Sequence, residues 1–139
     1  MNIFREHRAV IFSADSSGTG VAAGYVTRVK AGKIVGDEPL MQFANGQITP
    51  LSIDLGGADE EVILILFGTG LRHRNANSKV LATIGGADAQ VLYAGLQPYF
   101  VGLDQVNIRI PRSLQGKGVV DVNFSVDGKN ANPIQISVK

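Results

Sequence analysis

Two histidines, His7 and His73, are the first side chains in this sequence that could perform chemistry. A metal site needs several neutral or anionic ligands that converge, and Arg72 and Arg74, which flank His73, oppose a bound cation. No Ser–His–Asp set or paired general acid and base can be assembled around either histidine with supporting sequence context. The sequence therefore predicts no catalytic residue and no enzyme activity, with His73 in a solvent-exposed loop.

Carboxylates are the second group with chemical potential, at residues 37–38 (DE) and 59–61 (DEE). Calcium needs six or more converging oxygens, whereas adjacent carboxylates on a strand or turn point apart. We predict neither a metal nor a cofactor, and calcium stays open only if other loops supply ligands. Asp104, Gln105 and Asn107 open a predicted strand, where such side chains ordinarily cap the N–H groups of a turn.

A glycine pattern, Gly18-x-Gly20-x-x-x-Gly24, follows an apolar stretch at residues 9–13 and suggests a dinucleotide-binding loop. Such a loop requires a helix immediately afterwards, so that phosphate can sit at the helix N-terminus. The residues that follow alternate as in a strand and show no helical period. We interpret the segment as a structural loop whose glycines adopt positive φ.

Two loops hold the candidate ligand-binding residues, which are Arg72, His73, Arg74, Tyr99 and Phe100. The basic group could contact phosphate or an acidic glycan, although charged loop residues are more often simply solvated. The two aromatic residues could stack on sugar rings. The alternative, which we favour, is that they close one end of a sandwich, because an aromatic side chain gains much from burial.

Bulk properties limit the protein classes. The chain has 139 residues, a formal net charge of +1 and no cysteine, which suits one domain (1–139) without disulfides. The nearly balanced charge disfavours nucleic-acid binding. No apolar run is long enough to span a bilayer. The charged residues 1–8 and the short apolar stretch after them do not form a signal peptide.

Short runs rich in Val and Ile, separated by glycine-containing turns, predict an all-β domain. Residues 103–111, 120–126 and 134–138 alternate between apolar and polar side chains, as expected of half-exposed antiparallel strands. The sequence predicts a break in a strand at residues 36–39 and a tight turn at residues 45–46. It also predicts hairpin turns at residues 85–88, between arms 80–84 and 89–93, and at residues 127–130. Pro50, Pro133 and Lys139 are predicted partial blocks of strand edges, and dimerisation by edge pairing stays open.

Residues 62–67 (VILILF) differ from the other strands because both of their faces are apolar. We expect them to form a central strand, with residues 68–70 (GTG) as the turn that ends it. A strand in a simple two-sheet sandwich has only one dry face. The sequence therefore predicts that residues 9–55 pack against the outside of that sheet.

Several segments together resemble a family of uncharacterised C-terminal domains abundant in Solibacter and other acidobacteria, and more loosely the IPT/TIG-type immunoglobulin-like domains. The segments are residues 11–26 (IFSADSSGTGVAAGYV), 62–72 (VILILFGTGLR), 80–95 (VLATIGGADAQVLYAG), 98–111 (PYFVGLDQVNIRIP) and 120–138 (VDVNFSVDGKNANPIQISV). The resemblance implies an immunoglobulin-like antiparallel β-sandwich, which we place at residues 56–139. Together with the apolar faces of residues 62–67, this predicts an N-terminal β extension (1–55) packed on it. It also implies a place at the C-terminus of large exported proteins, and no assigned activity.

These observations together predict a non-catalytic structural or adhesion module of an exported or cell-surface bacterial protein. The resemblance implies an extracellular location, with other domains of a larger protein or a cell-surface component as partners. The alternative is a carbohydrate-binding module that uses the loops at residues 71–78 and 95–102.

Overall fold

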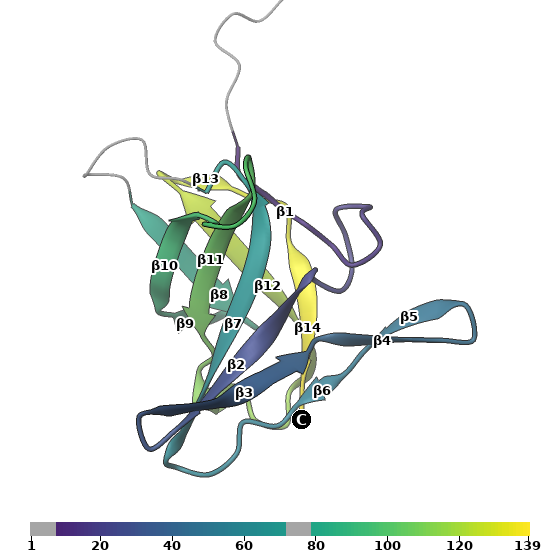
Figure 1. The fold of residues 1–139 in the computed structure, drawn as a ribbon, viewed down its shortest axis with the longest axis vertical. Coiled ribbons are helices and arrows are strands. Elements are labelled where there is room, and N and C mark those ends of the chain that lie inside the picture. The colour runs from purple at the N-terminus through teal and green to yellow at the C-terminus, as the bar shows by residue number, and fades with distance from the viewer. Residues whose placement is uncertain (1–7, 72–78) are drawn as a thin grey trace, which may run out of the picture.

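Two β-sheets packed face to face form the protein in the computed structural model, which describes residues 8–71 and 79–139 (Figure 1). The front sheet, nearer the viewer in Figure 1, has the strand order β10–β11–β7–β2–β3, and β1 pairs with β7 off this path. Its strands are β1 (Val10–Ile11), β2 (Gly24–Lys30), β3 (Lys33–Pro39), β7 (Glu60–Thr69), β10 (Val91–Leu96) and β11 (Asp104–Arg109).

The back sheet has the order β6–β14–β12–β8–β9, with β13 beside β12. Every neighbouring pair in the two sheets is antiparallel except β14 and β6, which are parallel. An all-β sandwich is therefore confirmed. The strands are β6 (Ser52–Ile53), β8 (Val80–Ile84), β9 (Ala87–Ala89), β12 (Gly118–Val126), β13 (Lys129–Asn130) and β14 (Ile134–Val138), and one short 3-10 helix, η1 (Arg112–Leu114), precedes β12.

Strand β7 lies at the centre of the front sheet, as its sequence predicts. Val62, Leu64 and Leu66 point into the core and are buried. On the other face Ile65 is also buried, while Ile63 and Phe67 are half-buried. The strand is two residues longer at each end than expected, because Glu60 and Glu61 begin it and Gly68 and Thr69 continue it. Only Gly70 has the positive φ of a turn, at 73°.

The N-terminal third belongs to the fold, but it joins by strand pairing and does not form a layer over the outer face of the front sheet. β2 pairs with β7 along its length, β3 pairs with β2, and β6 pairs with β14. Ile65 is covered from within its own sheet, because its cross-strand neighbours are Tyr25 and Asn107. Pairing satisfies the backbone groups of the edges of β7, which a covering layer would leave open.

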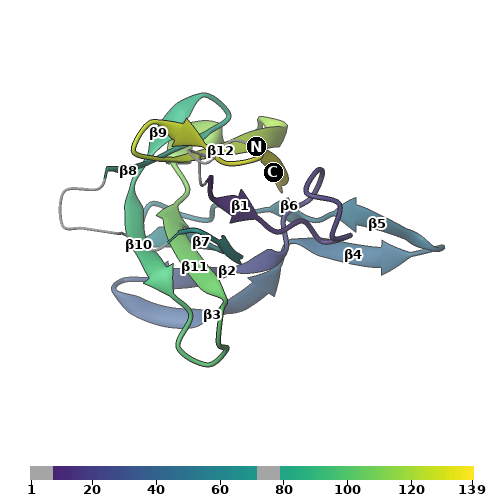
Figure 2. The same cartoon turned by 90° about the horizontal axis from the view of Figure 1, so that it is seen from above.

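Two tight hairpins follow one another in this N-terminal third. Ala31 and Gly32 turn β2 into β3, which runs through Pro39 and does not break at Gly36 as the sequence suggested. The second hairpin, β4 (Met41–Ala44) and β5 (Gln47–Pro50), turns at Asn45-Gly46 with positive φ at both residues. It forms a separate two-stranded sheet that projects away from the sandwich (Figures 1 and 2).

The chain changes sheets after β9. The predicted hairpin at residues 80–93 is correct in its first arm, β8, but Gly85-Gly86 alone forms the turn. β9 ends at Ala89, and β10 begins at Val91 in the front sheet. Gln90 is the crossing point, and its carbonyl accepts a hydrogen bond from the Arg109 N–H at 2.9 Å.

The final strands follow their predicted alternation except at Ser137, which is buried although its position was expected to face outward. Val106, Ile108 and Ile110 are buried, as are Val122 and Phe124 on β12 and all three predicted residues of β14. The expectation that Pro133 and Lys139 block an edge is wrong, because β14 is an interior strand between β6 and β12. In the described part of the chain, no helix is both long and apolar enough to cross a membrane.

Candidate functional site

The loop between β10 and β11 presents Val101 and Tyr99, the two most exposed large apolar side chains among the described residues, and Ile34 and Phe43 on other hairpins are the next most exposed. We call residues 97–102 the apolar tip. The exposed fractions of Tyr99, Phe100 and Val101 are 85%, 64% and 108%. The loop turns away from the back sheet (Figure 2). Three consecutive exposed apolar side chains make this loop a candidate contact surface, because burying them against a partner would be favourable.

Hydrogen bonds give this tip a defined shape. The Gln97 side-chain oxygen accepts the N–H groups of Tyr99 and Phe100 at 2.7 and 2.9 Å. The Gln97 N–H donates to the Leu103 carbonyl at 3.0 Å, which closes the hairpin. Gly102 adopts a φ of 79°, where a side chain is disfavoured. The tip is therefore a hydrogen-bonded turn, and its backbone holds the exposed side chains in a defined position.

The expectation that Tyr99 and Phe100 close the end of the sandwich is wrong. Leu71, which follows Gly70 just past the end of β7, is fully buried at this end instead. The Asp104 carboxylate accepts the Leu71 N–H at 3.0 Å and is itself buried. Asp104 thus caps the chain where it leaves β7, which confirms the capping role expected of it.

The three basic-loop candidates, Arg72, His73 and Arg74, lie outside the described residues. Tyr99 and Phe100 are therefore the two candidate ligand-binding residues that the structure places, and they are neighbours on one loop.

Arg28 gathers the carboxylates that the sequence presented as separate acidic clusters. Its guanidinium group donates to Glu38 at 2.6 and 3.0 Å, to Glu60 at 3.3 Å and to the Asp54 carbonyl at 2.6 Å. The hydrogen bond to Glu38 is the main reason that the pKa of Arg28 is raised. These contacts tie β2 to β3 and to the start of β7, so the carboxylates have a structural role.

Asp37 and Glu61, from the same clusters, also have protein partners. Asp37 accepts a hydrogen bond from the Thr27 hydroxyl at 2.8 Å, and Glu61 lies 3.4 Å from Arg109. Within residues 8–71 and 79–139, no group of three or more His, Cys, Asp or Glu side chains could hold a metal ion.

The glycine-rich segment at residues 14–20 is a structural loop, as interpreted from the sequence. Gly18 and Gly20 have φ of 84° and 82°, and the strand β2 follows the loop. The Asn132 side chain holds the loop to β1 by donating to the carbonyls of Ile11 and Gly18, each at 2.8 Å. Hydrogen bonds from the Ser17 hydroxyl, then from the Ser17 N–H and the Ser13 hydroxyl, lower the pKa of Asp15. The polar groups of this loop thus bind one another.

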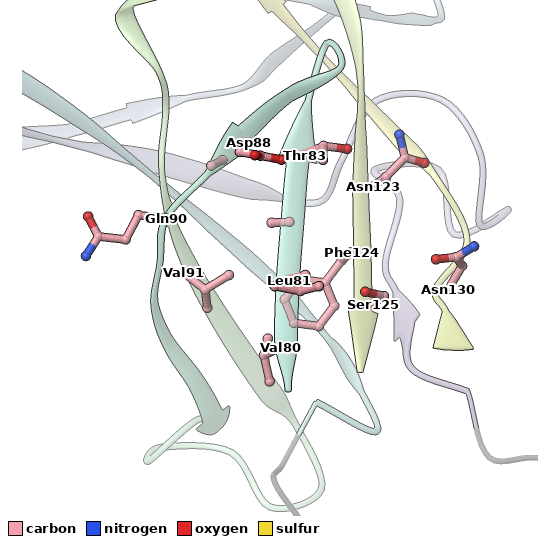
Figure 3. A pocket seen from close by; sticks show the side chains of 12 residues that line it. Val80, Leu81, Thr83, Asp88, Gln90, Val91, Asn123, Phe124, Ser125 and Asn130 are labelled. Carbon is pink, nitrogen blue, oxygen red and sulfur yellow. The ribbon is translucent and has the colours of Figure 1, made fainter. Parts of the chain in front are cut away.

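A hollow of about 620 Å³ lies beside the crossing point at Gln90 (Figure 3). Figure 3 shows a polar end with Thr83, Asp88 and Asn123 and an apolar end with Leu81 and Phe124. Asp88 is its one carboxylate, and Thr83 and Asp88 are cross-strand partners. Among the described residues that line it, no second titratable side chain stands beside Asp88 to form a paired acid and base.

Sequence reasoning missed Arg28 and Leu71. A lone Arg in an alternating strand gives no sign of three acceptors that are distant in sequence, whereas the Leu that follows Gly70 was a readable signal for a buried end plug. Comparisons of the chain with protein-family models, with characterised proteins and with solved structures gave no significant match.

Proposed function

We propose that this chain is a non-catalytic structural or adhesion module, working as the C-terminal domain of an exported or cell-surface bacterial protein. We further propose that it contacts its partner through the apolar tip. The observation that carries the proposal is the exposure of Tyr99, Phe100 and Val101 on a turn that Gln97 holds in shape. The immunoglobulin-like assignment and the extracellular setting rest on the sequence resemblance described above.

The energetics of the tip support a protein partner. Burying an apolar side chain yields about 1.5–3 kcal/mol, so three adjacent ones supply a substantial part of a binding free energy. Aromatic anchors are also enriched at the centres of protein interfaces. The tip carries no charged residue, so the complementary surface on the partner should be apolar as well.

A carbohydrate-binding module is the second candidate, and one observation favours it. The Tyr99 ring, 85% exposed, and the Tyr93 ring, 42% exposed, lie at the same end of the β10–β11 hairpin. Exposed aromatic rings can stack on the apolar faces of sugars. In this variant of the proposal, the same tip would bind a glycan of the cell surface.

Retention on envelope fractions tests both candidates. Beads coated with the full chain, and beads coated with a Tyr99→Ser/Phe100→Ser variant, are passed over immobilised acidobacterial envelope before and after protease treatment. For a protein partner, we expect retention of the wild type only, with loss after protease. Retention that survives protease, together with Tyr99-dependent signals on a glycan array, would select the carbohydrate alternative. Equal retention of wild type and variant would contradict both.

A further inference from the structure

The outermost strand of the front sheet, β10, has an open side. It pairs with β11 only, and no described strand lies beyond it. The Gln97 N–H donates to the Leu103 carbonyl, so the backbone of residue 97 faces β11. The direction of the backbone N–H and carbonyl groups alternates along a strand. The backbone groups of Tyr93 and Gly95 therefore also face β11, while the backbone groups of Ala94 and Leu96 face outward. The Tyr93 hydroxyl donates to the Leu96 carbonyl, and the outward N–H and carbonyl of Ala94 stay available for a neighbouring strand.

This edge lacks the charge by which most open strands avoid pairing. Residues 89–103 contain no Lys, Arg, Asp or Glu. Leu92, Tyr93 and Leu96 on the strand are all exposed. Natural edges are usually short, charged, interrupted by proline or covered. The register of β10 shifts at Leu92 and is regular from Tyr93 to Leu96, so its distal half is an intact template.

We propose that β10 pairs antiparallel with β10 of a second copy of this chain, about a two-fold axis at Ala94. The inference does not rest on the proposed function, because strand pairing needs no occupant at the tip. It joins the two front sheets edge to edge into one continuous sheet.

Self-complementarity is the reason to choose a second copy as the partner. An axis at Ala94 lets each Ala94 N–H donate to the Ala94 carbonyl of the other copy. It also sets Tyr93 opposite Gly95 of the second copy. The Tyr93 ring already lies against Gly95 of its own chain, 3.1 Å from where a β-carbon would sit, so the two rings have space side by side. Leu92 then faces Leu96, and no charge opposes the contact.

Sedimentation equilibrium of the full chain tests the proposal, because a dimer has twice the chain mass of 14.7 kDa. Ala94→Pro removes the outward N–H, which an edge strand tolerates. We expect a dimer for the wild type and at least about a tenfold rise in the dissociation constant for Ala94→Pro. The matched control is Val35→Lys on the opposite edge strand, β3, which should leave the dimer unchanged.

Charge complementation tests the register and does not depend on whether Ala94→Pro folds. One chain carries Leu92→Lys and Leu96→Lys, and the other carries Leu92→Glu and Leu96→Glu. Each alone should be monomeric, because like charges meet across the axis. Their equimolar mixture should recover the dimer, because opposite charges then face each other. A monomeric wild type at every concentration, a dimer insensitive to Ala94→Pro, or a mixture that stays monomeric would overturn the proposal.

Discussion

The two outer strands of the front sheet, β3 and β10, solve the problem of an open edge in opposite ways. The regular half of β3 reads Gly36-Asp37-Glu38-Pro39, with two charges and a final proline, and that of β10 reads Tyr93-Ala94-Gly95-Leu96. Arg28 anchors the first through Glu38, whereas the second leads into the apolar tip. The two edges therefore differ in charge, in anchoring and in the kind of surface that they can contact.

The two edges should differ most in how much a charged side chain contributes to the free energy of unfolding. Arg28→Ala should lower the free energy of unfolding by about 2–3 kcal/mol, because it leaves Glu38, Glu60 and the Asp54 carbonyl without this donor. The side chain of Arg28 is only 13% exposed, so water replaces these contacts poorly. Urea unfolding followed by circular dichroism measures the change.

Arg109→Ala is the matched control for Arg28, because Arg109 also pairs with a glutamate of β7 across the front sheet. Its ion pair with Glu61 is 3.4 Å long, and both side chains are 40% or more exposed. Exposed pairs contribute 1 kcal/mol at most, so we expect a loss below about 1 kcal/mol. Equal losses for Arg28→Ala and Arg109→Ala would show that β3 is not anchored by its charge.

At the uncharged edge, a single neutral side chain should hold the tip. Gln97→Ala removes the acceptor of the Tyr99 and Phe100 N–H groups, and we expect a loss of about 0.5–1 kcal/mol, confined to the tip. Amide hydrogen exchange should accelerate at Tyr99 and Phe100 and stay unchanged at Val26 in β2. Gln97→Glu keeps an acceptor and serves as the control. An unchanged exchange rate at both tip amides in Gln97→Ala would refute the role of Gln97.

The exposed side chains of the tip should contribute almost nothing to folding. Replacing Tyr99, Phe100 and Val101 with serine should change the free energy of unfolding by less than about 0.5 kcal/mol, because exposed positions rarely affect stability. Binding of a hydrophobic dye to the native protein should fall in the same variant. A stability loss of several kcal/mol would instead show that these side chains pack against the end of the sandwich.

The sequence predicted the strands that bury one face, because alternation directly reflects burial. Residues 103–111, 120–126 and 134–138 needed only their own pattern, and the tight turns needed only Asn45-Gly46 and Asp127-Gly128. The pattern could not predict the order of strands in space. The two apolar faces of β7 suggested a covering layer, yet cross-strand neighbours such as Tyr25 bury Ile65 equally well.

The candidate site was predictable in its residues but not in its exposure. Tyr99 and Phe100 were selected from the sequence, and their aromatic character argued for burial. Which way a hairpin loop turns depends on what already fills the end of the sandwich, and Leu71 does so from a distant part of the chain. The crossing at Gln90 was hidden for a similar reason: residues 89–93 read as a continuation of one hairpin arm.

The smallest expected effect concerns how far the charge of β3 reaches into the sheet. The pKa of Tyr25 is raised above 10.0, first by burial and then by the charge of Asp37 on the neighbouring strand. Asp37→Asn keeps an acceptor for the Thr27 hydroxyl and removes the charge, so the pKa of Tyr25 should move toward 10.0 and remain above it. Because the folded protein holds this proton more tightly, the contribution of Tyr25 to stability is complete below pH 10.0 and is lost as the pH rises through the raised pKa. Ultraviolet titration of phenolate formation, with Tyr25→Phe to assign the signal, measures the shift. If the pKa of Tyr25 does not respond to Asp37→Asn, the charge of Asp37 does not act on Tyr25, and burial alone raises this pKa.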